Sequence, residues 1–446
     1  MKALFVIENY LLIEYISSII LAARKNGITV VVFVCNPESK VIPVKANQDF
    51  KIISSGIKYG STFNQYLSKN IRKLINYISF YERDEQSVEY VNRYYLQLPL
   101  LLRVALRLKF PINRLININS LINFERKIPP CKKIIKILCD ISPGCVILAP
   151  HNKRPGLDME FIKASKILNI PSFIATLSWD NLTTKGVITS PPDLFFVWNK
   201  NQKQAALKYH MIKLSKIKIS GAYIFDKWID YQKNCSSSSP NCPEKHLRLD
   251  NVNYILYLGS SAGISSNESG IINELADKML NSLDPDLKKM KIFLRPHPSN
   301  SDYIKCINYP NVIIYNYSDP QMFLGDYGKE TFFYELFWAK AVIGINTSGL
   351  LDSVINLKNT YAILIDKLAN TQVDTLHFKE LVKSESIICT SSFDELLGLI
   401  SKFSQGRNNQ QNQLRFIEEF IFPKHNFNSC GEMIINNIIN FKKNLK

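Results

Sequence analysis

The feature that most constrains the fold is a regular alternation of short apolar runs with segments of helical spacing. Residues 2–7 form an apolar run with the length of a buried strand, residues 10–25 carry apolar side chains at helical spacing, and residues 28–34 are rich in β-branched side chains. Asn26 and Gly27 provide a helix stop before the last of these. This β-α-β opening favours a parallel sheet with helices on its faces.

The alternation continues in two series, separated by the small, polar stretch at residues 234–241, which predicts a linker. The expected strands are 145–149, 171–177, 193–198 and 217–220, then 254–258, 291–294, 312–315, 341–345 and 361–365. The expected helices are 62–81, 88–108, 158–168 and 202–209, then 271–283, 330–339, 350–356, 393–403, 413–420 and 430–443. A chain of 446 residues exceeds one ordinary core. We therefore expect the α/β class, with two doubly wound, Rossmann-like domains at 1–230 and 249–411, a linker at 231–248 and helices at 412–446.

The net charge of +17 indicates a polyanionic partner, such as nucleic acid, an anionic membrane or phosphorylated substrates, and the alternative is a lysine-rich and asparagine-rich composition with no specific partner. Residues 101–136 carry nine basic side chains against Glu125 alone, and leucines interleave with the first of them. This surface is expected to dock on anionic lipid or to hold a lipid-diphosphate acceptor, and the alternative is a solvated basic helix face. The basic residues do not interleave with aromatics on a recognisable nucleic-acid module, so we expect no nucleic-acid partner.

The nine cysteines contain no C-x-x-C pair, which favours a reducing compartment and no cysteine-built zinc site. Glu8 and Glu14 interrupt the apolar N-terminus, so it does not resemble a signal peptide, and no apolar run is long enough to span a bilayer. We expect a cytoplasmic protein, either free or docked peripherally on the inner face of the plasma membrane.

Ligands of open parallel sheets bind outside the carboxyl ends of the strands, so the loops that follow strands are the candidate sites. In "KIFLRPHPSN" a buried strand ends at Arg295 and at His297, which lies between Pro296 and Pro298. The prolines end the strand and stiffen the loop. Arg295 is suited to a phosphate or carboxylate, and His297 to a hydrogen bond with a phosphate or sugar. The alternative is a histidine satisfied within a turn.

Two loops of small residues in the second series are further donor-binding candidates. In "GINTSGLLDSV" the hydroxyls of Thr347 and Ser348 precede a helix start that favours an anion, Gly349 allows close approach, and Asp352 is placed to accept bonds from ribose hydroxyls. The alternative is a plain N-cap.

In "YLGSSAGIS", Ser260 and Ser261 are placed to contact a diphosphate or the reacting sugar, against the alternative of a polar turn.

In the first series, "TLSWDNLTTKG" also follows a strand. Trp179 offers a flat face for a sugar ring or base, Asn181 can bind hydroxyls, and Lys185 an anion. Asp180 is a candidate general base, and His151 at the neighbouring strand end is its rival. The alternative is an Asx-turn made by Asp180 and Asn181. No motif for metal binding is present, so we expect no metal and no cofactor beyond a co-substrate.

At these residues the chain resembles the GT-B superfamily of nucleotide-sugar glycosyltransferases, and more narrowly the bacterial enzymes of capsule, lipopolysaccharide and teichoic-acid synthesis. "RPHP" is similar to the R/K-P-H-P element of the glycerophosphotransferase-like and capsule-transferase branches, and "NTSGLLDSV" to the donor-phosphate helix, with Asp352 in place of the usual glutamate. "SGAYIFD" resembles the segment that leads from the acceptor domain into the linker. The resemblance implies two domains facing across a cleft, with an acceptor on residues 1–230, a nucleotide donor on residues 249–411 and C-terminal helices that cross back to the first domain.

The resulting hypothesis is a metal-independent glycosyltransferase of surface polysaccharide synthesis, which takes a nucleotide-sugar donor and a glycan or lipid-linked acceptor. Replacing His297 or Arg295 by alanine is expected to abolish turnover while the fold survives. The alternatives are a CDP-glycerol-type polyol-phosphate transferase on the same fold and a non-catalytic basic binding or scaffold protein. A non-hydrolysing nucleotide-sugar epimerase shares the architecture but needs more carboxylates than these loops contain.

Overall fold

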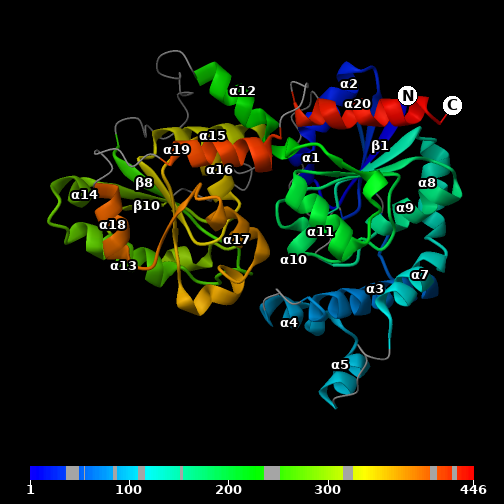
Figure 1. Ribbon diagram of the computed structural model, residues 1–446, viewed down its shortest axis with the longest axis horizontal. Coiled ribbons are helices and arrows are strands. Elements are labelled where there is room, and N and C mark those ends of the chain that lie inside the picture. The colour runs from blue at the N-terminus through cyan, green and yellow to red at the C-terminus, as the bar shows by residue number, and fades with distance from the viewer. Residues whose placement is uncertain are drawn as a thin grey trace. The chain divides into compact units, whose positions relative to one another are not determined.

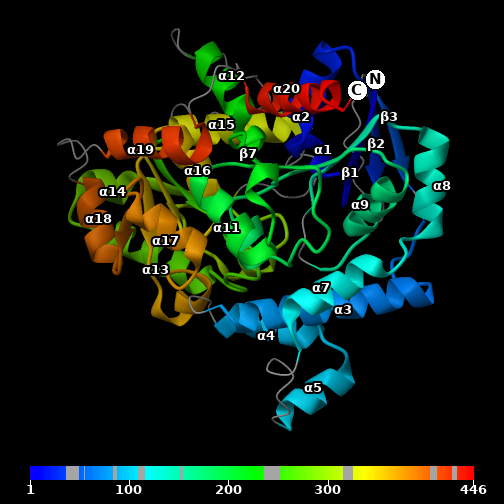
Figure 2. The same cartoon turned by 45° about the vertical axis from the view of Figure 1, so that its right-hand side comes forward.

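The computed structural model describes residues 1–36, 50–54, 56–83, 88–108, 116–150, 154–235, 252–314, 325–401, 409–423 and 429–445. The chain forms two compact units (Figures 1 and 2). Unit 1 contains Met1–Asp226 together with Phe420–Lys446, and unit 2 contains Lys227–Glu419. The predicted α/β class with two Rossmann-like sheets is confirmed.

Unit 1 is built on a seven-stranded sheet of order β3-β2-β1-β4-β5-β6-β7, and all its pairings are parallel. Its strands are β1 (Lys2–Ile7), β2 (Thr29–Val34), β3 (Lys51–Ser54), β4 (Cys145–Leu148), β5 (Ser172–Ala175), β6 (Leu194–Val197) and β7 (Ile217–Ile219). Its helices are α1 (Leu12–Tyr15), α2 (Ser17–Lys25), α3 (Phe63–Tyr81), α4 (Val88–Gln97), α5 (Leu100–Arg107), α7 (Ile118–Lys127), α8 (Lys132–Ile141), α9 (Asp158–Ile167), α10 (Asn181–Thr184), α11 (Lys200–His210) and α20 (Cys430–Lys443).

The two faces of this sheet are buried by different helices, as period-two alternation along β1 requires. Phe5 lies in one core cluster with residues of α2 and α20, whereas Leu4 and Val6 lie in another with residues of α8 and α9. The sheet is therefore doubly wound.

Unit 2 has a six-stranded parallel sheet of order β10-β9-β8-β11-β12-β13. Its strands are β8 (Tyr254–Leu258), β9 (Lys291–Arg295), β10 (Val312–Ile314), β11 (Ala341–Gly344), β12 (Thr360–Ile363) and β13 (Ile388–Thr390). Its helices are α12 (Asp226–Cys235, whose first residue belongs to unit 1), α13 (Ser269–Leu280), α14 (Pro285–Lys289), α15 (Gly325–Trp338), α16 (Gly349–Ile355), α17 (Leu376–Lys383), α18 (Phe393–Ser401) and α19 (Gln410–Phe416).

Where the structure differs from the expected elements, the cause is local. The helix expected at 88–108 is two helices, because Pro99 has extended backbone and precedes the first turn of α5. The edge strands β3 and β13 were not expected, since each is short and only partly buried and so carries a weak pattern. Of the stretch expected as a linker, residues 231–235 continue α12 and the remainder lies outside the described residues.

The last helix packs on unit 1, which confirms the expected return of the C-terminus. Helix α20 lies along α2 in both views (Figures 1 and 2). Its N-terminus is held by the carboxylate of Asp226, which accepts hydrogen bonds from the N–H groups of Cys430 (3.1 Å) and Gly431 (2.9 Å) and from the hydroxyl of Ser18. A carboxylate at a helix N-terminus satisfies donors that have no partner within the helix. By contrast, α19 belongs to unit 2, where the side chain of Gln413 donates to the carbonyl of Lys358 at 2.7 Å.

Gly431 is required by this packing. A Cβ at this position would lie 2.7 Å from the backbone carbonyl oxygen of Ser18, which cannot move without moving α2. We expect Gly431→Ala to lower the free energy of unfolding by about 1–3 kcal/mol, because α20 and α2 must separate. Urea unfolding measures this change.

Gly398→Ala is the matched control, because Gly398 lies on the exposed side of α18, where an added Cβ would meet no other atom within 4 Å. This change should be neutral or stabilising by up to about 1 kcal/mol. Equal losses in the two variants would contradict a specific contact between α20 and α2.

Candidate functional site

The strand order of unit 2 brings three of the expected loops to one edge of its sheet. Central strand β8 pairs with β9 on one side and β11 on the other, so the order reverses there. The segments after these three parallel strands, "GSSAG", "RPHPS" and "NTSG", therefore leave the sheet at the same edge, next to the switch point. In doubly wound sheets this is the position where ligands bind.

The first two of these loops are built as one piece. A Cβ on Gly259 would lie 3.0 Å from Cα of Pro296 and 3.1 Å from the backbone nitrogen of His297, so only glycine allows the close approach. The buried side chain of Asn300 donates to the carbonyls of Ser260 (2.9 Å) and Ser265 (2.8 Å). The loop that carries His297 is thus held by its neighbour as well as by its prolines.

His297 is half-buried, and one edge of its ring is fixed within the loop. Its Nδ1 accepts the N–H of Ser299 at 3.1 Å and lies 2.9 Å from the Ser299 hydroxyl. Because Nδ1 is an acceptor, the neutral ring carries its proton on Nε2. The alternative for His297, a histidine satisfied within a turn, is therefore present at Nδ1. This contact also fixes the ring and leaves Nε2 as the hydrogen-bond donor of the neutral ring.

Arg295 has a partner within unit 2. Its Nη1 lies 2.6 Å from Oε2 of Glu335 on α15, and its guanidinium lies over the ring of Phe332, 4.6 Å from the centroid. Glu335 is buried, and burial raises the pKa of its carboxyl. Arg295 therefore compensates a buried charge, and its contact with a phosphate stays a prediction.

The "NTSG" loop is explained largely by packing. A Cβ on Gly349 would lie 2.7 Å from Cδ1 of Leu258, so the glycine is required by the contact with β8. The hydroxyl of Thr347 accepts the N–H of Gly349 at 3.4 Å, and Ser348 makes no side-chain cap bond to α16.

Asp352, one turn into α16, accepts a hydrogen bond from the indole Nε1 of Trp228 at 2.8 Å. Burial raises the pKa of its carboxyl to about 7, against the opposing effects of this bond and of Lys329 and Arg295. The residue predicted to meet ribose hydroxyls thus titrates near neutral pH.

The two serines after β8 differ in exposure. Ser260 is buried, and its N–H donates to Oε1 of Glu268 at 2.8 Å, whereas Ser261 is half-buried.

In unit 1 the residues predicted for the acceptor lie together in one hydrogen-bonded loop. The carboxylate of Asp180 accepts from the hydroxyls of Ser178 (2.6 Å) and Thr184 (2.8 Å) and pairs with Lys185 at 3.2 Å. The buried side chain of Asn181 donates to the carbonyl of Pro150 at 3.1 Å, which ties this loop to the end of β4.

Trp179 of the same loop is only 6% exposed, so the packed indole does not present the open face predicted for a sugar. His151 lies outside the described residues.

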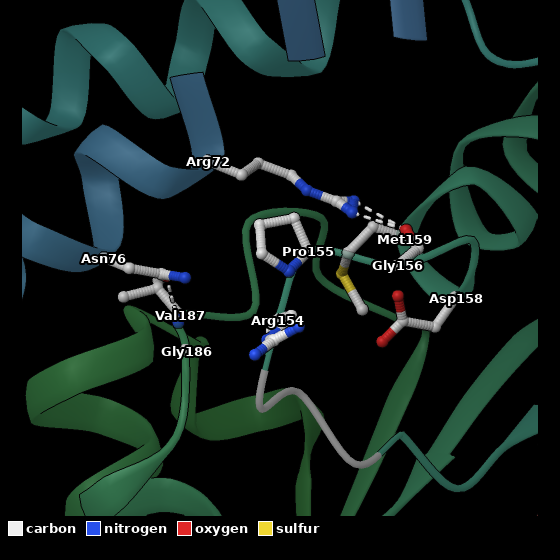
Figure 3. Close-up of a pocket in the computed structure, with 9 residues that line it drawn as sticks. All are labelled: Arg72, Asn76, Arg154, Pro155, Gly156, Asp158, Met159, Gly186 and Val187. Carbon is white, nitrogen blue, oxygen red and sulfur yellow. Dashed lines mark hydrogen bonds between the residues drawn. The ribbon is translucent and has the colours of Figure 1, made fainter. Parts of the chain in front are cut away.

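A pocket that the sequence did not indicate lies beside the loop from β4 to α9 (Figure 3). It is lined by Arg72, Asn76, Arg154, Pro155, Gly156, Asp158, Met159, Gly186 and Val187. Both terminal nitrogens of buried Arg72 donate to the carbonyl of Gly156, at 3.2 and 2.7 Å. Asp158 begins α9, and burial raises the pKa of its carboxyl, opposed by Arg72. These residues come from segments far apart in the chain, so no local motif marks them.

Near Arg72, three buried charged side chains form a network. Nζ of Lys163 lies 3.2 Å from Oε1 of Glu125 and 3.7 Å from Oε1 of Glu160. Glu125 also accepts the hydroxyl of Ser68 at 2.7 Å, and Glu160 accepts the N–H of Cys131 at 3.0 Å. Glu125, counted among residues 101–136, is therefore part of the interior.

Comparison with solved structures shows where this architecture recurs. A putative UDP-N-acetylglucosamine 2-epimerase from Listeria monocytogenes matches 99% of this chain and 97% of its own, at 9% identity and a TM-score of 0.58. The UDP-GlcNAc 2-epimerase from Neisseria meningitidis, solved with UDP-GlcNAc bound, matches 99% of this chain and 100% of its own, at 12% identity and a TM-score of 0.55. A glycosyltransferase from Rickettsia africae matches 100% of this chain and 98% of its own, at 11% identity and a TM-score of 0.52.

The chain has a GT-B-type fold. The resemblance seen in the sequence is confirmed at this level, since epimerases and glycosyltransferases share the architecture over nearly the whole chain. No protein-family model matches the chain, and no curated protein matches its sequence.

The ion pair with Glu335 changes what is expected of Arg295→Ala. Removing one partner leaves a buried carboxylate uncompensated, so we expect a loss of about 3–5 kcal/mol in the free energy of unfolding. The double variant Arg295→Ala with Glu335→Gln should recover part of this loss, because it removes the stranded charge. Denaturant unfolding of the wild type and the two variants tests this, and an Arg295→Ala protein as stable as the wild type would contradict it.

The raised pKa of Asp352 predicts a pH-dependent stability. This carboxyl binds its proton more tightly in the folded than in the unfolded chain, so its contribution to the free energy of unfolding decreases as the pH rises from about 4 to about 7. Asp352→Asn keeps an acceptor for Trp228 and cannot ionise. Its free energy of unfolding should therefore rise by about 3–4 kcal/mol relative to that of the wild type between pH 4 and pH 7.

Urea unfolding at a series of pH values measures the difference. Asp302→Asn, on the exposed surface of the same unit, serves as the control. Parallel pH profiles for the wild type and Asp352→Asn would contradict the expectation.

Proposed function

We propose that this protein is a metal-independent glycosyltransferase, which moves a sugar from a nucleotide-sugar donor to a glycan or lipid-linked acceptor in bacterial surface polysaccharide synthesis. The observation that carries the proposal is the position and tautomer of His297. The ring lies on a braced loop at the switch point of unit 2, with Nδ1 occupied as an acceptor and the proton on Nε2. Such a donor stabilises the charge that grows on a leaving nucleotide phosphate.

In this proposal the edge of unit 2 binds the donor. His297 donates to a phosphate or to the sugar, and Ser261, Thr347 and Ser348 offer hydroxyls at the neighbouring strand ends. The contribution of Arg295 is to hold α15 against β9 beneath this loop, since its guanidinium pairs with Glu335.

The acceptor is assigned to unit 1, at the carboxyl ends of β4 and β5. Asp180 is held in place by Lys185 and by the hydroxyls of Ser178 and Thr184. Asp158, with its raised pKa and its place in the pocket beside Arg72, joins Asp180 and His151 as a candidate base.

A polyol-phosphate transferase using a CDP-linked donor is supported by the same loops, and nucleotide identity separates it from the glycosyltransferase.

A nucleotide-sugar 2-epimerase is favoured by one specific observation. Asp158 lines the pocket beside Arg72 in unit 1, which adds a carboxylate that the strand-end loops did not indicate. Epimerisation at C2 must break a C–H bond, so an epimerase would incorporate deuterium from D2O into the sugar without any acceptor. A transferase would not.

The first test is thermal stabilisation by UDP, CDP, GDP, TDP and CMP, each with and without a chelator. A nucleotide that binds the folded protein at about 100 times its Kd stabilises it by about 2.7 kcal/mol. We expect one nucleotide to raise the melting temperature, with or without chelator, and His297→Ala to reduce that shift by at least half.

Lys305→Ala, which removes an exposed cation from the same unit, is the matched control and should behave as the wild type. No shift with any nucleotide, or an equal shift in His297→Ala, would overturn the proposed donor site. If the sugar-linked form of the stabilising nucleotide also incorporates deuterium from D2O at C2 of its sugar, the epimerase would replace the transferase.

A further inference from the structure

Helix α5 carries an apolar stripe that faces away from the protein. Leu100 is 67% exposed, Val104 45%, and Leu108, which follows the last turn, 77%. Their spacing of four residues places them on one side of the helix, and Leu101, 84% exposed, lies beside them. Large exposed apolar side chains gathered on one face mark an interaction surface.

The opposite side of the same helix is anchored. Leu102, Ala105 and Leu106 pack against the cluster that contains Tyr94 and Leu98 of the preceding segment. The hydroxyl of Tyr95 donates to the carbonyl of Arg103 and accepts from Nε of Arg107, both at 3.2 Å. The helix is therefore a packed part of unit 1, and in both views it stands out beyond α3 and α4 (Figures 1 and 2).

The surroundings of the stripe are basic. By helical spacing, Arg103 and Arg107 border one side of it, and the sequence contains no acidic residue from Arg93 to Phe124. The described part of residues 101–136 does not form one continuous exposed basic surface. Arg126 donates to the carbonyl of Thr189 at 2.6 Å, and Glu125 is buried. The apolar and basic features coincide on α5.

We propose that α5 is a membrane-docking helix, which lies in the plane of an anionic bilayer with Leu100, Leu101, Val104 and Leu108 among the acyl chains. The arginines at its border contact lipid phosphates. A short amphipathic helix with a basic edge binds at the interface through buried apolar area and attraction to anionic headgroups. Charge complementarity selects an anionic lipid surface over another protein, because both charged residues of α5, Arg103 and Arg107, are basic and lie beside the stripe. Among the described residues, no helix has the length and apolar character to cross a bilayer, and interfacial docking needs none.

This inference is independent of the reaction that the protein catalyses, so it is tested without nucleotide or acceptor. Full-length protein is sedimented with vesicles of phosphatidylcholine containing about one quarter phosphatidylglycerol, and with phosphatidylcholine alone. We expect binding to the anionic vesicles, at least about tenfold weaker binding to the neutral ones, and loss of most binding at about 0.5 M NaCl.

The variant Leu101→Asp with Leu108→Asp should weaken binding to anionic vesicles by at least about tenfold, because two exposed leucines lose their place in the acyl region. Leu283→Asp is the matched control, since Leu283 is a fully exposed leucine of unit 2 and its replacement should leave vesicle binding unchanged. Both sites are exposed, so the fold should survive, and circular dichroism checks it.

Two outcomes would overturn the proposal. One is absent vesicle binding, or binding equal in the α5 variant and the wild type. The other is a wild-type dimer in size-exclusion chromatography that the α5 variant converts to a monomer, which would assign the stripe to a second copy of this chain.

Discussion

The structure depends on one constraint: every strand pairing in both sheets is parallel. Parallel neighbours cannot be joined by a tight turn, so each strand is followed by a crossover that returns along a face of the sheet. The crossovers bury both faces, and they send the segments after all strands to one edge. In unit 2 this brings together the loops after β8, β9 and β11, although these strands end far apart in the chain, at Leu258, Arg295 and Gly344. The proposed donor site is a consequence of that topology.

Buried charges then decide which of the residues at these edges are structural. Arg295 and Asp352 have the chemistry of ligand-binding residues, yet Arg295 pairs with Glu335 and Asp352 bonds to Trp228. Removing a charge from water is costly unless the charge is paired or hydrogen-bonded. Folding by itself therefore explains these partners, without any ligand. His297 differs, because its contact with Ser299 holds Nδ1 as an acceptor and thereby sets the proton of the neutral ring on Nε2.

The two proposals concern different parts of the chain and support each other chemically. A transferase that builds surface glycans on lipid-linked acceptors works on substrates held at a bilayer. Helix α5 offers an apolar stripe with a basic border in unit 1, the unit to which the acceptor is assigned. Docking there would raise the local concentration of a lipid-linked acceptor without any contact to its sugar.

Much of the fold was predictable, because strands that are buried on both faces consist of continuous apolar runs, which are recognisable in the sequence. Strands β1 and β8 and helix α20 have the bounds that their patterns predicted, and the prolines around His297 marked the braced loop. Short edge strands such as β3 were missed, since half-buried backbone leaves little pattern.

The sequence by itself determined the α/β class, the two series of strands and the loops that follow them, because hydrophobic periodicity and proline chemistry act locally. Only the tertiary structure decided the partners of Arg295 and Asp352, the pocket beside Arg72 and the outward direction of the leucines of α5. These features depend on contacts between residues far apart in the chain. The burial of a side chain is defined only once the chain has folded. Burial determines how costly a charged group is and whether an exposed leucine marks an interaction surface.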